Sequence, residues 1–421
     1  MTAEEERELL YWLFAQRIFG CGSAQPMQFF QLYGSMTAFF EKTIFSPKQE
    51  LYRAAFLRRG EKSRLESIRP ESCREILSRC REEGVSLLTP ASPNYPECLR
   101  KIDAPPAVLY CKGELPPVDE IPAIAVVGSR KASPNSLQAT RAICRQLAQA
   151  GAVVVSGGAL GVDSAAHEGA LDVGGRTLCL LPCAIDVPYL SSKAEMRRRI
   201  LEQGGALVSE FPPGTEVQKW HFDVRNRLIS GLSCGVLVAE AGVKSGTMLT
   251  VRHAAEQSRE IFTLPLGVWE ENAEGMLRLL WDGAKPVSCA ADILTEYQSR
   301  FPGFPVPQRA PLSELGERPP APEEKASPAA KKAAKSSASA KAAKSSSAKE
   351  PEAPKKPKKP LSALSPKAQQ LYAALSDQPV TSAELCYRTE LPIQDVLVAA
   401  LELELAGYLR SFSGSRYAKE G

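Results

Sequence analysis

Three short segments of the chain combine small, hydroxyl-bearing and cationic residues in an order that suits phosphate binding. The first is Gly128-Ser129-Arg130, which follows a run of aliphatic residues and precedes Ser133-Pro134, a helix start. A glycine lets the backbone approach an anion, the Ser129 hydroxyl and nearby helix amides donate to it, and the Arg130 guanidinium holds phosphate oxygens. The alternative is a plain strand-to-helix turn with a solvated arginine.

The second segment is a glycine-rich loop that follows another aliphatic run. Its glycines are Gly157, Gly158 and Gly161. The loop lacks the complete Gly-x-Gly-x-x-Gly fingerprint, and no acidic residue closes a second strand to hold a ribose, so a dinucleotide cofactor is disfavoured. We expect Asp163 to cap a helix that begins at Ser164, and His167 to pack inside the domain rather than act as a base.

The third segment, Ser245-Gly246-Thr247, lies between an aliphatic run and a helical pattern and makes a further helix start that suits an anion. Three such loops together favour a phosphate-rich ligand. No metal-ligand spacing and no nucleophile–base spacing accompanies them in the sequence. We therefore predict no metal, no cofactor and no catalytic residue.

A fourth segment, residues 219–227, interleaves cations with aromatic rings. Its candidate contacts are Lys219, Phe222, Arg225, Asn226 and Arg227. This pattern suits single-stranded nucleic acid, because cations follow the phosphates while rings stack on unpaired bases. In the alternative interpretation Arg225 or Arg227 pairs with an acidic neighbour inside the domain, Asn226 is structural, and Lys219 points outward.

The elements that must position these segments form a repeating pattern between residues 121 and 296. Predicted strands lie at 124–127, 153–156, 177–181, 207–210, 236–239 and 261–264, with a further one at 107–111. Near-continuous Val, Ile and Leu runs, separated by amphipathic stretches such as 137–149, indicate strands covered on both faces. The fold class is therefore α/β, a Rossmann-like doubly wound sheet. Ligands of such sheets bind beyond the carboxyl ends of the strands, where the three loops begin.

The whole chain of 421 residues divides into four predicted parts. These are a small helical domain (1–85), the Rossmann-like central domain (86–300), a flexible linker rich in Lys, Ala, Ser and Pro (301–360) and a winged helix (361–421). Short helices with glycine turns in the first part either grip a DNA backbone, as helix-hairpin-helix modules do, or dock onto a neighbouring domain, which we favour. The last part predicts helices at 365–375, 382–389 and 392–406, followed by a β-wing.

Composition excludes several classes of protein. Hydrophobic residues make up 44% of the chain and charged residues 24%, as in ordinary globular proteins. No apolar run approaches the roughly 20 residues that cross a bilayer, and the first residues are acidic, unlike a signal peptide, so we expect a cytoplasmic protein without membrane contact. The eleven cysteines contain no Cys-x-x-Cys pair and are predicted to be reduced core residues.

Charge is concentrated in one tract. Residues 321–360 hold eleven Lys and four Glu, or +7, so the net charge of +4 leaves −3 for the rest of the chain. The predicted winged helix is acidic, and its presumed recognition helix carries Asp395, Glu402 and Glu404 without any Lys or Arg. A helix that reads a DNA groove is normally basic, so we expect this module to bind protein or to pack on the body.

The four segments together resemble one family, DNA-processing protein A (DprA, also called Smf). The resemblance covers residues 86–296 and is carried by Val127-Gly128-Ser129-Arg130, Ser156-Gly157, Asp163-Ser164-Ala165-Ala166-His167, Pro212-Pro213-Gly214-Thr215, the run from Arg225 to Ser233, and Ser245-Gly246-Thr247. The resemblance implies a non-catalytic cytoplasmic protein that binds and protects single-stranded DNA in natural transformation. It also implies loading of the RecA recombinase and a homodimer formed through the central domain.

The resemblance also implies roles for single residues. Arg130 would hold phosphate with Ser129 beside it, Lys219 would line the same basic pocket, and Phe222 would stack on a base. Two positions depart from the family pattern, because Leu160 stands where an arginine is usual and Asp223 where a proline is common. The lower local charge leads us to expect that the lysine tract contributes to affinity through counterion release.

The sequence is also compatible with two other classes of function. One is a nucleotide-processing hydrolase, since similar domains occur in phosphoribohydrolases. Those resemble Pro-Gly-Gly-x-Gly-Thr-x-x-Glu in the loop that contains Thr247 here, and the glutamate is missing, so Glu240 would have to replace it. The other is a pure interaction scaffold, which a failure to bind any nucleic acid would favour.

Overall fold

The structure is a computed structural model that describes residues 2–46 and 57–309 and, apart from short gaps at 362–363, 377, 379, 390 and 413–415, residues 361–419. The chain forms two compact units, Met1–Glu323 and Glu324–Gly421, which are described separately. The lysine tract at 321–360 lies outside the described residues.

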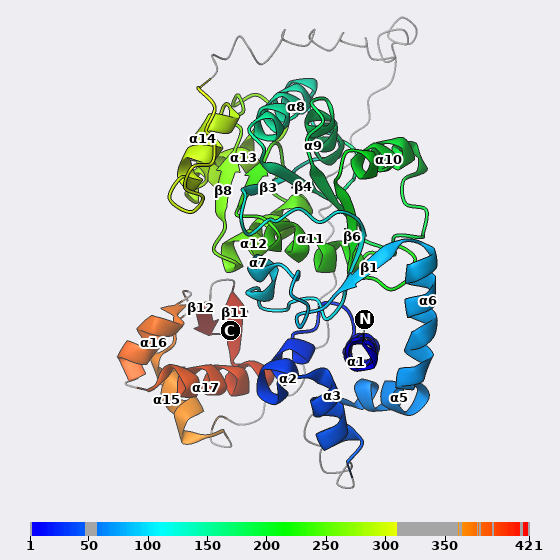
Figure 1. The fold of residues 1–421 in the computed structure, drawn as a ribbon. Helices are drawn as coiled ribbons and strands as arrows, with labels where there is room; N and C mark the ends of the chain where they lie inside the picture. Colours follow the sequence, from blue (N-terminus) through cyan, green and yellow to red (C-terminus); the bar gives the residue numbers. More distant parts are fainter. Residues whose placement is uncertain are drawn as a thin grey trace, which may run out of the picture. The chain divides into compact units, whose positions relative to one another are not determined.

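A nine-stranded sheet with the order β1-β2-β6-β5-β4-β3-β7-β8-β9 forms the centre of the first unit (Figure 1). Its strands are β1 (Val85–Leu88), β2 (Leu109–Gly113), β3 (Ala123–Val127), β4 (Val153–Ser156), β5 (Thr177–Leu180), β6 (Ala206–Ser209), β7 (Gly235–Val238), β8 (Glu260–Thr263) and β9 (Lys285–Pro286). In sheet order, all neighbouring strands from β6 through β3 to β9 pair in parallel, whereas β2 pairs with β6 antiparallel. Strand order reverses at β3, which pairs with both β4 and β7, so the switch point of the doubly wound sheet lies between β3 and β7.

Helices cover both faces of this sheet, which explains the uninterrupted aliphatic strands. Alternate residues of β3 point to opposite sides: Ile124 and Val126 pack with helices α8 and α9, whereas Ala125 and Val127 pack with α11 and α12. The helices on the first side are α8 (Pro134–Gln149), α9 (Val162–Leu171), α10 (Ala194–Glu202) and α14 (Ala290–Leu294). Those on the second side are α7 (Glu97–Arg100), α11 (His221–Gly231), α12 (Thr247–Glu256) and α13 (Ala273–Trp281). Figure 1 shows the two layers on either side of the strands.

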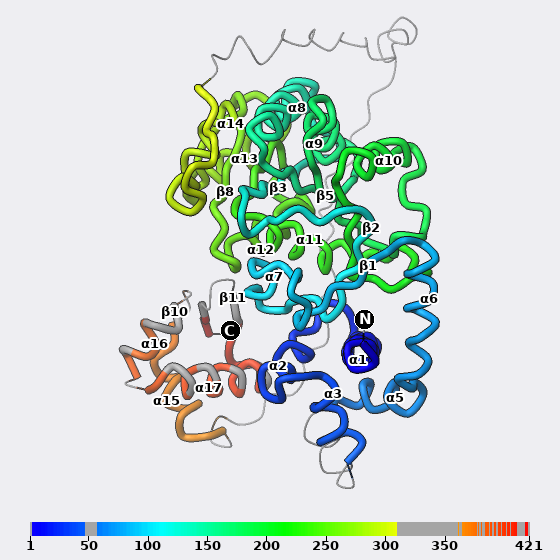
Figure 2. The backbone as a smooth tube through the Cα atoms, in the orientation of Figure 1, coloured from blue at the N-terminus to red at the C-terminus, as the bar shows by residue number. Residues whose placement is uncertain are grey.

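The N-terminal helices pack at the β1 end of the sheet (Figure 2). They are α1 (Ala3–Phe19), α2 (Gln25–Tyr33), α3 (Met36–Phe39), a π-helical turn (Phe40–Ile44), α5 (Arg59–Ser67), a 3₁₀ turn (Pro70–Cys73) and α6 (Arg74–Glu82). Thr2 caps α1 in a reciprocal capping box with Glu5. Fully buried aromatic side chains such as Trp12 and Phe14 share one core with Val108 and Tyr110 of the central domain. The helices therefore dock onto their neighbour, as favoured from the sequence.

The second unit is a small helical module with a three-stranded sheet of order β10-β12-β11. Its elements are α15 (Pro366–Ala374), β10 (Val380–Thr381), α16 (Ser382–Thr389), α17 (Ile393–Leu405), β11 (Leu409–Phe412) and β12 (Arg416–Lys419). The acidic residues of α17 serve partners inside the module: Glu402 accepts the Ser365 amide at the start of α15, and Asp395 pairs with Lys367 at 2.9 Å. These contacts account for two of the three carboxylates on the presumed recognition helix.

The predicted strands agree with the observed ones to within one or two residues, and the three C-terminal helices to within one. The fold class is thus confirmed. The domain boundaries at 85, 300 and 360 stay predictions. All eleven cysteines are free thiols, and nine of them are buried. No helix among the described residues is long and apolar enough to span a membrane.

Candidate nucleic-acid interface

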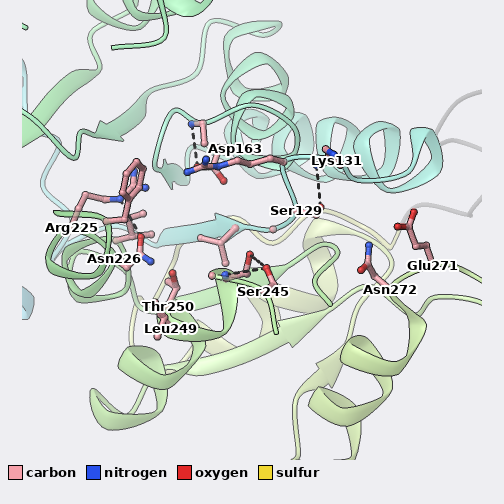
Figure 3. A pocket seen from close by; sticks show the side chains of 18 residues that line it. Ser129, Lys131, Asp163, Arg225, Asn226, Ser245, Leu249, Thr250, Glu271 and Asn272 are labelled. Atoms are coloured by element: carbon pink, nitrogen blue, oxygen red, sulfur yellow. Dashed lines mark hydrogen bonds between the residues drawn. The ribbon is translucent and has the colours of Figure 1, made fainter. Parts of the chain in front are cut away.

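A pocket of 480 Å³ opens beyond the carboxyl ends of β3 and β7, at the switch point of the sheet. It is lined by Val127, Gly128, Ser129, Arg130, Lys131, Ala159, Asp163, Phe222, Arg225, Asn226, Ile229, Ser245, Gly246, Thr247, Leu249, Thr250, Glu271 and Asn272. Figure 3 shows Arg225 and Asn226 at one end of the pocket and Glu271 and Asn272 at the other. Segments from five parts of the chain thus meet around one cavity.

The loop after β3 supplies the free cations of the pocket. The Ser129 hydroxyl oxygen accepts the Lys131 amide at 3.1 Å, and the Ser129 amide donates to the Glu240 carbonyl at 2.7 Å, so the loop is fixed between β3 and β7. The Arg130 and Lys131 side chains are exposed and form no ion pair with any residue that the structure describes. Both charges are therefore available to an anionic ligand.

The glycines of the second loop do not line the pocket, but they allow the backbone to approach residues that do. Gly161 has φ +76°, and a Cβ there would lie 2.3 Å from the Ser129 carbonyl oxygen, so the two loops touch only because residue 161 is glycine. A Cβ on Gly157 would lie 2.0 Å from Nη1 of Arg225. A Cβ on Gly158 would lie 2.6 Å from the sulfur of Cys179. Of this stretch, only Ala159 and Asp163 reach the cavity.

Asp163 does not cap a helix that begins at Ser164. Helix α9 begins at Val162, one residue before Asp163, and Gly161 is its N-cap. The Asp163 carboxylate instead accepts the amide of Ala159, which lies in the loop before the helix, at 3.3 Å. Burial raises the pKa of Asp163 above its ordinary value, and the nearby charge of Arg225 only partly opposes that shift.

His167 packs inside the domain, as predicted. Its Nδ1 lies 2.8 Å from the Thr177 hydroxyl, which donates to the Val154 carbonyl at 2.7 Å. Because that hydroxyl proton is already committed, His167 donates from Nδ1 and carries no proton on Nε2. Burial lowers the pKa of His167 to about 3.

Helix α11 brings Phe222 and Arg225 to one end of the pocket. Arg225 is buried and donates from Nη1 to the carbonyls of Gly157 and Leu180, both at 2.7 Å. Its Nε donates to Asn226 at 3.2 Å, while its Nη2 has no hydrogen-bond partner among the described residues. Arg225 therefore joins α11 to the second loop and still keeps one donor for the cavity. Asn226 holds Arg225 in place, as the structural interpretation proposed.

Arg227 and Lys219 do not line the pocket, which corrects two expectations. Arg227 forms a buried ion pair with Glu210 and donates to the Ala104 carbonyl. The paired interpretation of Arg227 is thus the right one. Lys219 is exposed in the segment before α11, outside the cavity. Periodicity alone did not distinguish these side chains from Arg225.

The third loop brings all three of its predicted residues into the lining. The Ser245 hydroxyl donates to Thr247 Oγ1 at 3.1 Å and accepts the Thr247 amide at 3.2 Å, which begins α12. A Cβ on Gly246 would meet open space. This loop therefore lines the same cavity as Arg130 and Lys131.

Glu240, the carboxylate that a hydrolase would need, is already engaged. It accepts the Ser133 amide at 2.9 Å and the Asn272 side-chain amide at 2.7 Å, and it does not line the pocket. Burial alone would raise the pKa of Glu240, but the hydrogen bonds outweigh burial and hold the pKa below its ordinary value. The residue fastens the first loop to the loop after β8.

Sequence reasoning missed part of the lining. The missed residues include Lys131, Leu249, Thr250, Glu271 and Asn272. Glu271 and Asn272 follow β8, so the strand-end rule applied to the sixth predicted strand would have found them. The two residues that depart from the family pattern, Leu160 and Asp223, do not line the pocket. The Asp223 carboxylate lies 3.1 Å from Nε2 of His253.

The pocket thus lies at the switch point of a doubly wound sheet, and the second unit is a small helical module with a three-stranded sheet. The family model described as DNA recombination-mediator protein A matches residues 86–298, and the DprA winged helix domain matches residues 354–415. The chain belongs to this family, as its motifs predicted.

Individual relatives agree with this assignment. The chain is 30% identical over 348 residues to Protein Smf of Synechocystis sp., covering 82% of this chain and 83% of the relative. It is 34% identical over 239 residues to DNA processing protein DprA of Bacillus subtilis, covering 57% and 80%. The X-ray structure of DprA from Streptococcus pneumoniae superposes with a TM-score of 0.57 at 28% identity, covering 69% of this chain and 97% of that one.

Proposed function

We propose that the protein binds single-stranded DNA in the switch-point pocket, with phosphates held by Arg130 and Lys131 and a base stacked on Phe222. The observation that carries this proposal is that two unpaired cations and an aromatic ring meet at one cavity. Cations follow a single strand's phosphates and rings stack on its bases. A duplex buries its bases, so it can use the cations but not the ring.

We further propose that it acts in the cytoplasm as a non-catalytic mediator that protects incoming strands in natural transformation and loads RecA. The description of the family as a recombination mediator supports this role. Two acidic residues near the cavity have structural duties, since Glu240 holds Ser133 and Asn272 while Asp163 holds Ala159. No group of three or more His, Cys, Asp or Glu that could hold a metal occurs among the described residues.

A homodimer formed through the central domain is part of the same proposal, because two copies would hold two strands together. Sedimentation over a concentration series tests it directly. A mass that stays at one chain at every concentration would contradict this part and leave the proposed DNA binding by a single copy untouched.

The central experiment is fluorescence anisotropy of a labelled oligo-dT across a salt series. Arg130→Ala and Lys131→Ala should each weaken binding and flatten its salt dependence, by a slope of about 0.7 for each phosphate of a single strand that the variant no longer neutralises. The matched control is Arg198→Ala, an exposed arginine on α10 that pairs with Glu195 and Glu202. Unchanged affinity in both pocket variants would exclude the pocket as the binding site.

Two further measurements separate the alternatives. Deletion of residues 321–360 should lower affinity and reduce the salt slope if the lysine tract contributes through counterion release. Release of free base from a nucleoside monophosphate would revive the hydrolase, and binding to RecA without any DNA affinity would favour the scaffold. RecA filament formation on the bound oligonucleotide tests the loading role.

A further inference from the structure

One aromatic ring, in the loop that also supplies Glu271 and Asn272 to the pocket lining, is not packed into the fold. Trp269 lies in the loop between β8 and α13 and is 97% exposed, and its neighbour Val268 is exposed as well. The ring makes no hydrogen bond and no ring contact with any described residue. A fully exposed tryptophan contributes almost no hydrophobic stabilisation to the fold. Its ring face is open to solvent and can stack on a flat partner.

The position of this ring relative to the pocket follows from the chain. Trp269 precedes Glu271 and Asn272, which line the end of the cavity away from Arg225 (Figure 3). Phe222 belongs to the Arg225 end, because the Arg225 guanidinium lies 5.9 Å from its ring. The Gly267 carbonyl accepts the Glu270 amide at 2.9 Å, so Trp269 lies in a turn that directly precedes these lining residues. Phe222 therefore belongs to one end of the cavity, and the loop that carries Trp269 supplies the lining residues of the other end.

The charges around Trp269 indicate which part of a strand it would meet. Glu270 and Glu271 directly follow Trp269 in the chain, and both are exposed. Carboxylates repel a phosphate backbone, whereas the flat face of an indole accepts any base. A strand that crosses the pocket with its phosphates on Arg130 and Lys131 would thus meet this loop with a base.

We propose that Trp269 is a second base-stacking platform, which extends the single-strand site beyond the pocket on the side opposite Phe222. This inference rests on the proposed function and names a nucleobase as the occupant. The site then spans more than one nucleotide, with a sequence-tolerant contact at each end.

The test compares Trp269→Ala with Trp281→Ala in binding a long labelled oligo-dT. Trp281 is a matched control, because it is 78% exposed at the other end of α13, about 12 Å along the helix from Ala273. Loss of one stacked base lowers affinity roughly five- to 150-fold. We expect that loss for Trp269→Ala, near-wild-type binding for Trp269→Phe, and no change for Trp281→Ala. Equal affinities of the wild type and Trp269→Ala, or equal losses in both alanine variants, would overturn the inference.

Two probes keep this outcome distinct from failure of the pocket itself. A strand of abasic sites carries phosphates without bases, so Arg130→Ala should still weaken its binding while Trp269→Ala should not. In a Trp220→Phe/Trp281→Phe background Trp269 is the only exposed tryptophan, since Trp12 is buried, and bound oligo-dT should quench its fluorescence. Loss of the Arg130 effect would refute the proposed function, whereas quenching that is absent despite binding would refute only the Trp269 site.

Discussion

The guanidinium of Arg130 lies 5.2 Å from the centre of the Phe222 ring. A cation at this distance is attracted to the ring face, by about 0.5–1 kcal/mol at an exposed site. The residue assigned to phosphate and the residue assigned to a base therefore hold each other before DNA arrives. Such a pair limits the freedom that each side chain must lose on binding.

Phe222→Ala should weaken oligo-dT binding by about 1–3 kcal/mol, because it removes both the stacking face and the support of Arg130. Phe222→Tyr keeps a ring of the same shape and should bind close to wild type. Anisotropy titrations of the two variants check this. Equal losses in both would mean that the ring is not a stacking surface.

Gly157→Ala should weaken DNA binding and lower the thermal midpoint, because its Cβ would occupy the place of Arg225 Nη1. Gly246→Ala is the control within the same pocket, since its φ is −59° and its Cβ would meet open space. We expect it to remain stable and to bind DNA. If Gly157→Ala bound DNA normally, Arg225 would have no part in the site.

DNA affinity should rise as the pH falls, and Asp163→Asn should reduce that rise. Burial raises the pKa of Asp163, so its carboxyl gains a proton at a higher pH than an exposed aspartate does. Protonation removes a negative charge from the pocket lining, which favours a phosphate ligand. Oligo-dT is the suitable probe because thymine does not titrate in acid. A pH profile identical in wild type and Asp163→Asn would contradict this role.

The protein should lose stability in mild acid because of His167. Its pKa is lowered from 6.5 to about 3 by burial, so the unfolded chain binds a proton before the folded chain does. The free energy of unfolding should fall by up to about 1.4 kcal/mol per pH unit below pH 6.5, ending near pH 3. Denaturant unfolding of His167→Gln should show a shallower slope.

The control for this prediction is His253→Gln, which removes a histidine that lies beside the carboxylates of Asp223 and Glu256. It should retain the acid-dependent slope that His167→Gln loses. A slope that survives in His167→Gln would assign the acid sensitivity to other groups.

The sheet and its loops were predictable because strand composition and loop glycines are local signals. The three loops at 128–130, 157–161 and 245–247 were placed at strand ends, and the structure brings the first and third into the pocket lining. Local spacing could not separate Arg225 from Arg227, because their partners lie far away in the sequence. Gly157 is 68 positions from Arg225, and Glu210 is 17 from Arg227.

The lining residues after β8 escaped prediction for a related reason. Glu271 has an ordinary loop context, and Asn272 is fixed by Glu240 from a neighbouring strand end. Their position depends on the order of strands in the sheet, which places β8 beside β7. The strands and helices can be predicted from a single sequence, but the position of β8 beside β7 is known only from the folded structure.

The contacts of Glu210 bear on how the first unit unfolds. This buried carboxylate follows β6, pairs with Arg227, and accepts the Gly22 amide of the N-terminal region at 2.8 Å, while its carbonyl accepts the Gln16 side chain at 2.9 Å. Removing residues 1–85 would strip hydrogen bonds from a buried charge, a loss that is strongly destabilising. The N-terminal helices and the sheet should therefore melt in a single calorimetric transition, as one thermodynamic unit rather than as a domain with a detachable appendage.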